Sequence, residues 1–251
     1  MPSVILAQLQ EAAQQGRKQL AVLIDPDKAS EQHLLQLVRK AEQMGADYFF
    51  VGGSLISSDR LGQTISLIKK YVEIPVVIFP GGATQLSDNA DGILLLSLIS
   101  GRNPEFLIGA HVIAAPALRR SGIQILPTGY MLVDGGAPTT VSYISNTTPI
   151  PANKPDIAAC TAMAGEMLGL QLIYMDAGSG APNPIPAAMI KAVKRSVKLP
   201  VIVGGGMRTA EAAQAAWLAG ADVVVIGNAL EEQPSLIEEL SVALRGANHQ
   251  Y

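Results

Sequence analysis

The chain has 251 residues, of which 49% are hydrophobic and 16% are charged, and its formal net charge is −3. Disordered and coiled-coil proteins carry more charge and fewer apolar residues, so this composition excludes both classes. The single cysteine, Cys160, excludes a disulfide framework and a Cys-based zinc site. The mildly acidic balance, without a cluster of Lys and Arg, argues against nucleic acid as a partner.

The apolar runs of the chain are too short to cross a membrane. The longest covers residues 92–99, whereas a spanning helix needs about 20 apolar residues. The N-terminal residues lack the basic-then-apolar pattern of a signal peptide, and a lone cysteine fits a reducing compartment. We therefore expect a cytoplasmic protein.

Short apolar runs alternate with amphipathic segments from one end of the chain to the other. Continuous apolar runs are typical of strands that are buried on both faces of a parallel sheet. The predicted strands cover residues 20–24, 48–51, 76–79, 93–96, 124–127, 172–175, 201–203 and 223–226. The predicted helices cover residues 4–15, 31–44, 61–72, 104–121, 154–168, 186–197, 209–219 and 234–244. Ser30 and Thr209 are expected to cap two of these helices.

This alternation, with no linker, predicts an α/β fold: a single (βα)₈ TIM barrel over residues 1–251 with an extra N-terminal helix. Residues 80–91 show no helical pattern, so the third helix of the barrel, which would follow the third strand, is expected to be missing or irregular. The connection over residues 128–157 is long for a barrel of this kind, which suggests a functional role. A doubly wound open sheet is the alternative architecture.

Glycines follow several predicted strands, at the end of the barrel where active sites of this fold lie. Gly205 and Gly206 follow the seventh strand, Gly227 and Asn228 follow the eighth, and residues 176–180 follow the sixth. Backbone N–H groups approach a phosphate closely where side chains are absent, and this position is the recurrent phosphate site of TIM barrels. The pattern therefore predicts a phosphate site, although glycines also serve tight turns.

Two residues at the ends of the first two strands suit a magnesium ion. Asp25 and Ser54 offer a carboxylate and a hydroxyl, which are hard oxygen ligands. An Asp-Pro-Asp segment is also a common turn, and we expect Asp27 to serve as a turn residue or helix cap.

Asp176, at the end of the sixth strand, is a candidate general base next to the predicted phosphate site. The alternative is that its carboxylate caps the following turn through Ser179. The histidines show neither metal-ligand spacing nor a neighbouring nucleophile.

Six segments at the strand ends resemble the geranylgeranylglyceryl phosphate synthase family. They read LIDPDK, FFVGGS, PTGYMLVDGGAPTTVSYIS, YMDAGSGAPNPIP, VGGGMRT and VIGNALE, and the resemblance extends over nearly the whole chain. Leu23 stands where the heptaprenylglyceryl phosphate synthases of Gram-positive bacteria carry a lysine. The chain thus resembles the larger archaeal and bacterial branch, with the heptaprenyl enzymes as an alternative.

The resemblance implies a Mg²⁺-dependent prenyltransferase that takes part in ether-lipid synthesis. In that reaction sn-glycerol 1-phosphate attacks C1 of geranylgeranyl diphosphate, an ether bond forms and diphosphate leaves. By similarity, Asp25 and Ser54 hold the magnesium. The glycerol hydroxyl must lose its proton, a catalytic role that Asp176 would fill, and Tyr130 and Tyr174 are candidates to flank the reacting centre. Many family members have Glu where this chain has Asp176, whose side chain is shorter by one methylene. The residues that hold glycerol 1-phosphate by similarity are Tyr174, Met175, Asp176, Ala177, Gly178, Ser179, Gly180, Gly205, Gly206, Gly227 and Asn228.

The prenyl tail of such a substrate requires an apolar groove, which the missing third helix would leave open. Candidate lining residues are Leu94, Leu96, Leu98 and Ile99, although core packing explains these residues equally well. The resemblance also implies a homo-oligomer, either a dimer or a hexamer, and transient membrane contact at most, because the substrate and product are lipids.

Two other functions share part of this pattern. Phosphate-binding isomerase or lyase barrels, such as those of tryptophan and histidine biosynthesis, have the same glycine loops. The pair Asp25 and Ser54, and the absence of a catalytic Lys or Asp pair at the barrel rim, count against them. A non-catalytic barrel that binds a phospho-ligand or a lipid would be favoured by the loss of Asp25, which is present.

Overall fold

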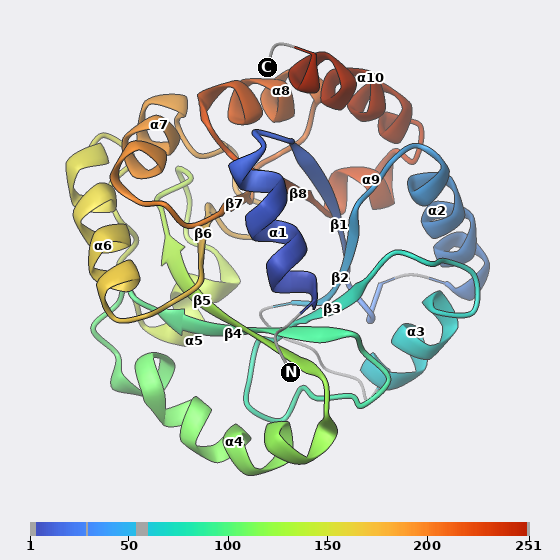
Figure 1. Ribbon diagram of the computed structural model, residues 1–251, viewed down its shortest axis with the longest axis horizontal. Helices are drawn as coiled ribbons and strands as arrows, with labels where there is room; N and C mark the ends of the chain where they lie inside the picture. Colours follow the sequence, from blue (N-terminus) through green and yellow to red (C-terminus); the bar gives the residue numbers. More distant parts are fainter. Residues whose placement is uncertain (1–3, 29, 54–59, 250–251) are drawn as a thin grey trace.

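Eight parallel strands close into a barrel in chain order, and β8 pairs with β1 (Figure 1). The computed structural model describes residues 4–28, 30–53 and 60–249. The closed barrel confirms the TIM-barrel prediction and excludes the open sheet. The strands are β1 Gln19–Ile24, β2 Tyr48–Gly52, β3 Val76–Phe79, β4 Gly92–Leu98, β5 Gln124–Leu132, β6 Leu172–Asp176, β7 Val201–Gly204 and β8 Val223–Ile226.

The longer helices form a ring around the barrel, whereas α1 crosses one end of it (Figure 1). They are α1 Val4–Gln14, α2 Glu31–Gln43, α3 Leu61–Ile68, α4 Ala110–Ser121, α5 Thr140–Ser145, α6 Pro155–Met167, α7 Ala187–Ser196, α8 Ala210–Ala219, α9 Asn228–Glu232 and α10 Leu236–Asn248. As predicted, Ser30 and Thr209 accept hydrogen bonds from the first turns of α2 and α8. None of the helices in the described part of the chain has the length and hydropathy to cross a bilayer.

The predicted N-terminal helix closes the barrel at the end where the strands begin. Ile5 and Leu9 of α1 are buried against the side chains that fill the barrel interior. The backbone N–H of Ile5 also donates to the side chain of Gln124, at the start of β5. Because α1 covers this end, a ligand has access from the opposite end, where the strands terminate.

The helix that would follow β3 in a regular (βα)₈ barrel is missing, as the sequence predicted. Residues 80–91, between β3 and β4, contain no helix, and all of them are described. The helix predicted over residues 104–121 is divided: a short π-helical segment, η1 Glu105–Gly109, precedes α4. These two features leave one side of the barrel covered less regularly than the others.

The fifth strand is longer than predicted, and this difference matters for the site. The prediction ended the strand at Pro127, whereas β5 continues to Leu132. Proline is unusual inside a sheet because it lacks an N–H. Pairing between β5 and β6 begins only at Thr128, beside Leu172, so the missing donor of Pro127 interrupts no ladder. The extension places Tyr130 in the strand. The expectation that residues 128–132 belong to the connecting loop is therefore wrong.

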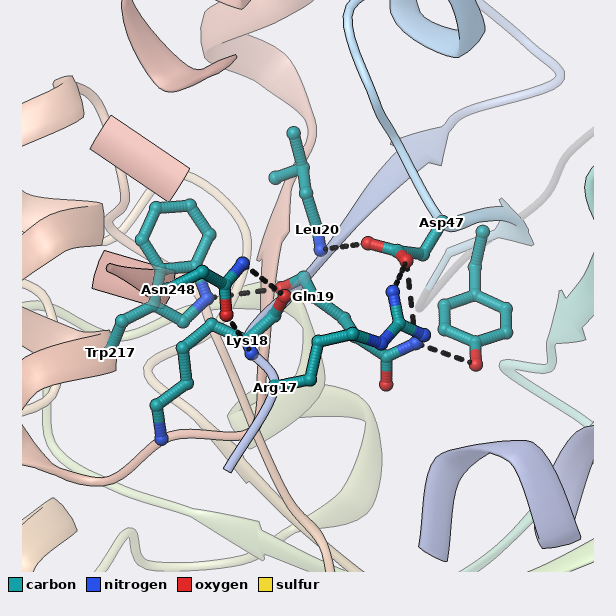
Figure 2. A network of polar contacts seen from close by, with 8 residues as sticks. Arg17, Lys18, Gln19, Leu20, Asp47, Trp217 and Asn248 are labelled. Atoms are coloured by element: carbon teal, nitrogen blue, oxygen red, sulfur yellow. Dashed lines mark hydrogen bonds and ion pairs between the residues drawn. The ribbon is translucent and has the colours of Figure 1, made fainter. Parts of the chain in front are cut away.

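A polar network fixes the start of β1 at the closed end of the barrel (Figure 2). The side chain of Asn248, at the end of α10, accepts from the N–H of Lys18 and donates to its carbonyl oxygen. Trp217 of α8 donates to the carbonyl oxygen of Gln19, and Asp47 accepts from the N–H of Leu20. The network therefore joins the C-terminal helix to the first strand.

Candidate active site

A cavity of about 430 Å³ opens at the end of the barrel where the strands terminate. Parallel strands place all their carboxyl ends at this same end, so the connections that follow β1, β6, β7 and β8 meet there. The predicted site residues that line it are Asp25, Tyr174, Asp176, Ser179, Gly180, Gly205, Gly206, Gly227 and Asn228. The structure thus brings together most of the residues that the sequence predicted.

Three predicted residues of the β6 connection lie behind the cavity wall. Met175 and Ala177 are buried in the core between the strands and the helices, and they are not among the lining residues. Gly178 contributes its backbone N–H, which donates to Asp176 Oδ1 at 2.7 Å. The side chains of Met175 and Ala177 therefore pack in the core and do not line the cavity.

The glycine loops after β6 and β7 fit against each other. Gly205 has a φ of +77°, and a Cβ at this position would lie 2.6 Å from the backbone nitrogens of Ala177 and Gly178. Such a separation is closer than packed atoms tolerate, and L residues avoid this backbone conformation. Glycine at position 205 is therefore required for the two loops to pack this closely against each other.

Asp176 is buried at the bottom of the cavity, and two donors hold its carboxylate. Oδ2 accepts a hydrogen bond of 2.5 Å from the Tyr130 hydroxyl, and Oδ1 accepts from the N–H of Gly178. Burial raises the pKa of the Asp176 carboxyl, while the two hydrogen bonds lower it in part. The alternative contact through Ser179 is not formed: the turn is closed by Gly178 instead.

Three aromatic rings cluster on the side of the Tyr130 hydroxyl that contacts this carboxylate. The ring centroids of Phe79, Tyr130 and Tyr174 lie 5.3 to 6.2 Å from one another. Burial raises the pKa of both tyrosine hydroxyls well above the usual value, and the neighbouring Asp176 raises it further. Both tyrosines are therefore neutral at physiological pH, so Tyr130 acts as a hydrogen-bond donor to Asp176.

Asp25 lies at the rim, where its carboxylate closes the turn after β1. Oδ1 accepts from the N–H of Asp27 at 3.0 Å. Asp27 lies in this turn, as expected, and Ser30 caps the helix that follows. Ser54, the second predicted magnesium ligand, lies outside the described residues, although the neighbouring Gly53 lines the cavity.

Four charged residues of the cavity were not singled out by the sequence reasoning. Lys28 lines the cavity next to Asp25, although no rim lysine had been expected; Arg208, Glu231 and Glu232 also line it. Glu231 Oε1 accepts from the N–H of Asp25, and burial raises the pKa of its carboxyl. The signal lay in three of the strand-end segments: LIDPDK holds Lys28, VGGGMRT holds Arg208 and VIGNALE holds Glu231.

The charge balance of the cavity suits a bound divalent cation. The described lining residues include four carboxylates, Asp25, Asp176, Glu231 and Glu232, but only two cationic side chains, Lys28 and Arg208. Magnesium is often held by one or two protein carboxylates together with substrate phosphates and water. The described residues contain no cluster of three or more potential metal ligands, so the donor set fits magnesium held jointly with a substrate and does not fit a closed metal site.

A second, apolar pocket of about 110 Å³ lies beside β3 and β4, where no helix follows β3. Leu96 and Leu98 line it, as predicted, together with residues of η1, α4 and α5. Leu94 is instead buried in the barrel interior, and Ile99 faces a separate surface depression. Leu94, Leu96 and Leu98 lie two residues apart and share one face of β4. Leu94 lies nearer the start of the strand, away from the pocket, and Ile99 lies just beyond the strand.

Phe79 lines both the polar cavity and the apolar pocket. Tyr130 lines the apolar pocket through its ring, while its hydroxyl reaches Asp176 of the polar cavity. The long connection after β5 contributes Thr140 to the polar cavity and Val141 to the apolar one. The two spaces therefore meet at the aromatic rings, next to the Asp176 carboxylate.

A family model, curated relatives and a solved structure each match most of the chain. Residues 13–244 match the model of the PcrB family. A geranylgeranylglyceryl phosphate synthase of Spirosoma linguale is 54% identical over 93% of this chain and 94% of its own length. One from Chitinophaga pinensis is 54% identical over 92% of each chain. The crystal structure of (S)-3-O-geranylgeranylglyceryl phosphate synthase from Thermoplasma acidophilum, in complex with the substrate sn-glycerol-1-phosphate, has a TM-score of 0.91 at 33% identity and covers 98% of this chain and 100% of that one.

Proposed function

Because this chain belongs to the PcrB family of prenyltransferases, we propose that it joins sn-glycerol 1-phosphate to geranylgeranyl diphosphate through an ether bond, with Mg²⁺ as cofactor and release of diphosphate. The named relatives are geranylgeranylglyceryl phosphate synthases, and the structure from Thermoplasma acidophilum holds sn-glycerol-1-phosphate. These similarities support the substrates. The geometry of this chain supports the way in which they are held.

The observation that carries the proposal is the meeting of a polar and an apolar space at Phe79. Prenyl diphosphates consist of an anionic head and a long hydrocarbon tail. In this proposal the tail enters the apolar pocket beside Leu96 and Leu98, and the head occupies the cavity beside Asp25. The bond between head and tail then lies near the aromatic rings, within reach of Asp176.

In the proposed reaction, the free primary hydroxyl oxygen of glycerol 1-phosphate bonds to C1 of the prenyl chain. The bond from C1 to the diphosphate oxygen breaks, and its electron pair leaves with the diphosphate. The hydroxyl proton passes to the Asp176 carboxylate. Asp176 accepts hydrogen bonds from Tyr130 and Gly178, and these occupy two of about four acceptor positions of a carboxylate. The remaining positions are available to the incoming hydroxyl.

The loops after β6, β7 and β8 hold the phosphate of glycerol 1-phosphate in this proposal. Gly205, Gly206 and Gly227 bring backbone N–H groups to the cavity wall, and Asn228 adds a side-chain amide. Asp25 and Ser54 would hold the magnesium. When bound, Mg²⁺ neutralises charge that accumulates on the departing diphosphate.

The direct test is an assay with Mg²⁺, sn-glycerol 1-phosphate and geranylgeranyl diphosphate. We expect an ether product from the 1-phosphate, little from sn-glycerol 3-phosphate, and none from Asp25→Ala protein. Absence of product, while glycerol 1-phosphate still binds, would contradict the proposal and leave a non-catalytic phosphate-binding barrel.

We also propose that the protein associates with copies of itself. Several large apolar side chains are exposed on η1, α4 and α5, including Ile108, Val112, Ile113 and Tyr143, and exposed apolar patches of this kind often mark interaction surfaces. Light scattering at several concentrations will give the number of subunits, and a strictly monomeric protein would contradict association. A cytoplasmic location with transient membrane contact remains part of the proposal.

A further inference from the structure

Lys28 connects two parts of the polar cavity that come from different connections of the barrel. Its Nζ lies 3.2 Å from Asp25 Oδ2 and donates to the side-chain oxygen of Asn228 at 3.1 Å. The side-chain nitrogen of Asn228 in turn donates to Ser179 Oγ at 3.2 Å. Asp25 follows β1, Asn228 follows β8 and Ser179 follows β6. The proposed diphosphate end and glycerol phosphate end of the cavity are therefore joined through one ammonium group.

The ammonium of Lys28 keeps the capacity to bind a ligand. An ammonium has three N–H donors, and Asp25 and Asn228 accept two of them. The nearest oxygen of Glu231 lies 3.9 Å away, beyond hydrogen-bond distance. The Lys28 side chain is 48% exposed and lines the cavity. Among the contacts within the described residues, one donor is thus available to an anion in the cavity.

The proposed reaction places two anions in this one cavity. The glycerol hydroxyl must come within about 3.5 Å of C1 of the prenyl diphosphate for the bond to form, so the two phosphoryl groups are separated by only a few bonds' length. Their negative charges repel each other strongly where water is excluded. The second anion therefore binds weakly unless a cation lies close to both.

Among the described lining residues, Lys28 and Arg208 carry the positive charges. The guanidinium of Arg208 donates to the carbonyl oxygens of Gly180 and Ala181, both in the connection after β6. It therefore serves the glycerol phosphate end alone. Lys28 differs because its contacts reach both ends.

We propose that Lys28 is a binding residue shared by the two phosphoryl groups, lying between the diphosphate beside Asp25 and the glycerol phosphate beside Asn228. The inference rests on the proposed function. It implies coupling: the ammonium lowers the repulsion that each anion imposes on the other. By thermodynamic linkage, the loss of Lys28 must change the coupling between the two ligands by the same factor, whichever ligand is titrated.

The test is a set of calorimetric titrations with the full-length protein in Mg²⁺. Glycerol 1-phosphate is titrated with and without saturating inorganic pyrophosphate, which stands in for the diphosphate head and does not react. We expect Lys28→Met to weaken glycerol 1-phosphate about tenfold or more with pyrophosphate present, and clearly less without it. Lys28→Arg should recover part of the coupling because it restores the charge.

The matched control is Lys40→Met, which removes a lysine that forms an exposed ion pair with Glu238; it should leave both titrations unchanged. Equal weakening of glycerol 1-phosphate in Lys28→Met protein, with and without pyrophosphate, would overturn the inference, as would no weakening at all. The proposed function fails separately, if unmodified protein binds neither ligand.

Discussion

The Tyr130 hydroxyl donates to Asp176 Oδ2 at 2.5 Å, and this hydrogen bond links adjacent strands at the bottom of the cavity. Tyr130 is paired in register with Tyr174, and Asp176 with Leu132. Residues two apart in a strand point to the same face. Tyr130 and Asp176 therefore both face the barrel interior, and the tyrosine ring reaches along the barrel axis to the carboxylate.

Replacement of Asp176 by Asn should separate activity from stability. An amide cannot accept the hydroxyl proton, so we expect kcat to fall by about 10² to 10⁴. Burial raises the pKa of Asp176 in the folded protein, so ionisation destabilises the fold, and the stability present at low pH is lost as the pH rises through the folded-state pKa. At pH 7 Asp176→Asn should therefore be at least as stable as the unmodified protein in urea unfolding. Unchanged kcat would exclude Asp176 as the base.

Replacement of Tyr130 by Phe should change the pH dependence of the reaction. The hydroxyl of Tyr130 stabilises the ionised form of Asp176 and so lowers the pKa of that carboxyl. Without it the pKa rises, and the acidic limb of the pH profile of kcat/KM should move to higher pH. A profile that keeps its position while only the maximum rate falls would show that Tyr130 does not influence the base.

Replacement of Asp25 by Asn should remove the proposed magnesium site with little effect on the fold. The amide oxygen can still accept from the N–H of Asp27, and the ion pair with Lys28 is partly exposed, so stability should change by less than about 1 kcal/mol. Activity should fall about 100-fold or more, since the charge on the diphosphate is no longer neutralised. Full activity that still depends on Mg²⁺ would place the metal elsewhere.

The apolar pocket can be tested with a pair of substitutions in the same helix. Ala110 lines the pocket, and Ala115, which is exposed, does not. We expect Ala110→Phe to lower kcat/KM for geranylgeranyl diphosphate relative to farnesyl diphosphate by about tenfold, because the longer tail loses room. Ala115→Phe should leave the ratio unchanged. An equal ratio in both variants would mean that the tail binds elsewhere.

Asp222 should matter for stability and not for the reaction. Its carboxylate is 2% exposed, and Oδ2 accepts from Lys194 Nζ and from the N–H of Val201, at the start of β7. Asp222→Ala removes the acceptor of the Val201 N–H and leaves Lys194 Nζ with only the carbonyl oxygen of Leu199, at 3.5 Å, so the free energy of unfolding should fall by roughly 3 kcal/mol. The exposed pair of Lys40 and Glu238 provides the comparison: Glu238→Gln should cost less than about 1 kcal/mol. Urea unfolding measures both, and equal effects would contradict this reasoning.

The sequence by itself determined the eight-stranded barrel, its N-terminal helix and the absence of a helix after β3. These features depend on the local alternation of apolar and amphipathic segments, and continuous apolar runs are what a strand buried on both faces requires. The glycine loops could also be predicted from the sequence, because a positive φ or a close approach of two backbones requires glycine at that position. Asp25 and Asp176 could be selected as the polar residues that directly follow strands.

Only the tertiary structure decided which side chains meet. The extension of β5 past Pro127 depends on where β6 begins, which no local pattern shows, and it is this extension that brings Tyr130 to Asp176. Lys28 and Glu231 are about 200 residues apart in the sequence, yet both lie beside Asp25 because β1 and β8 pair when the barrel closes. Contacts between distant segments depend on register and closure, which are properties of the whole sheet.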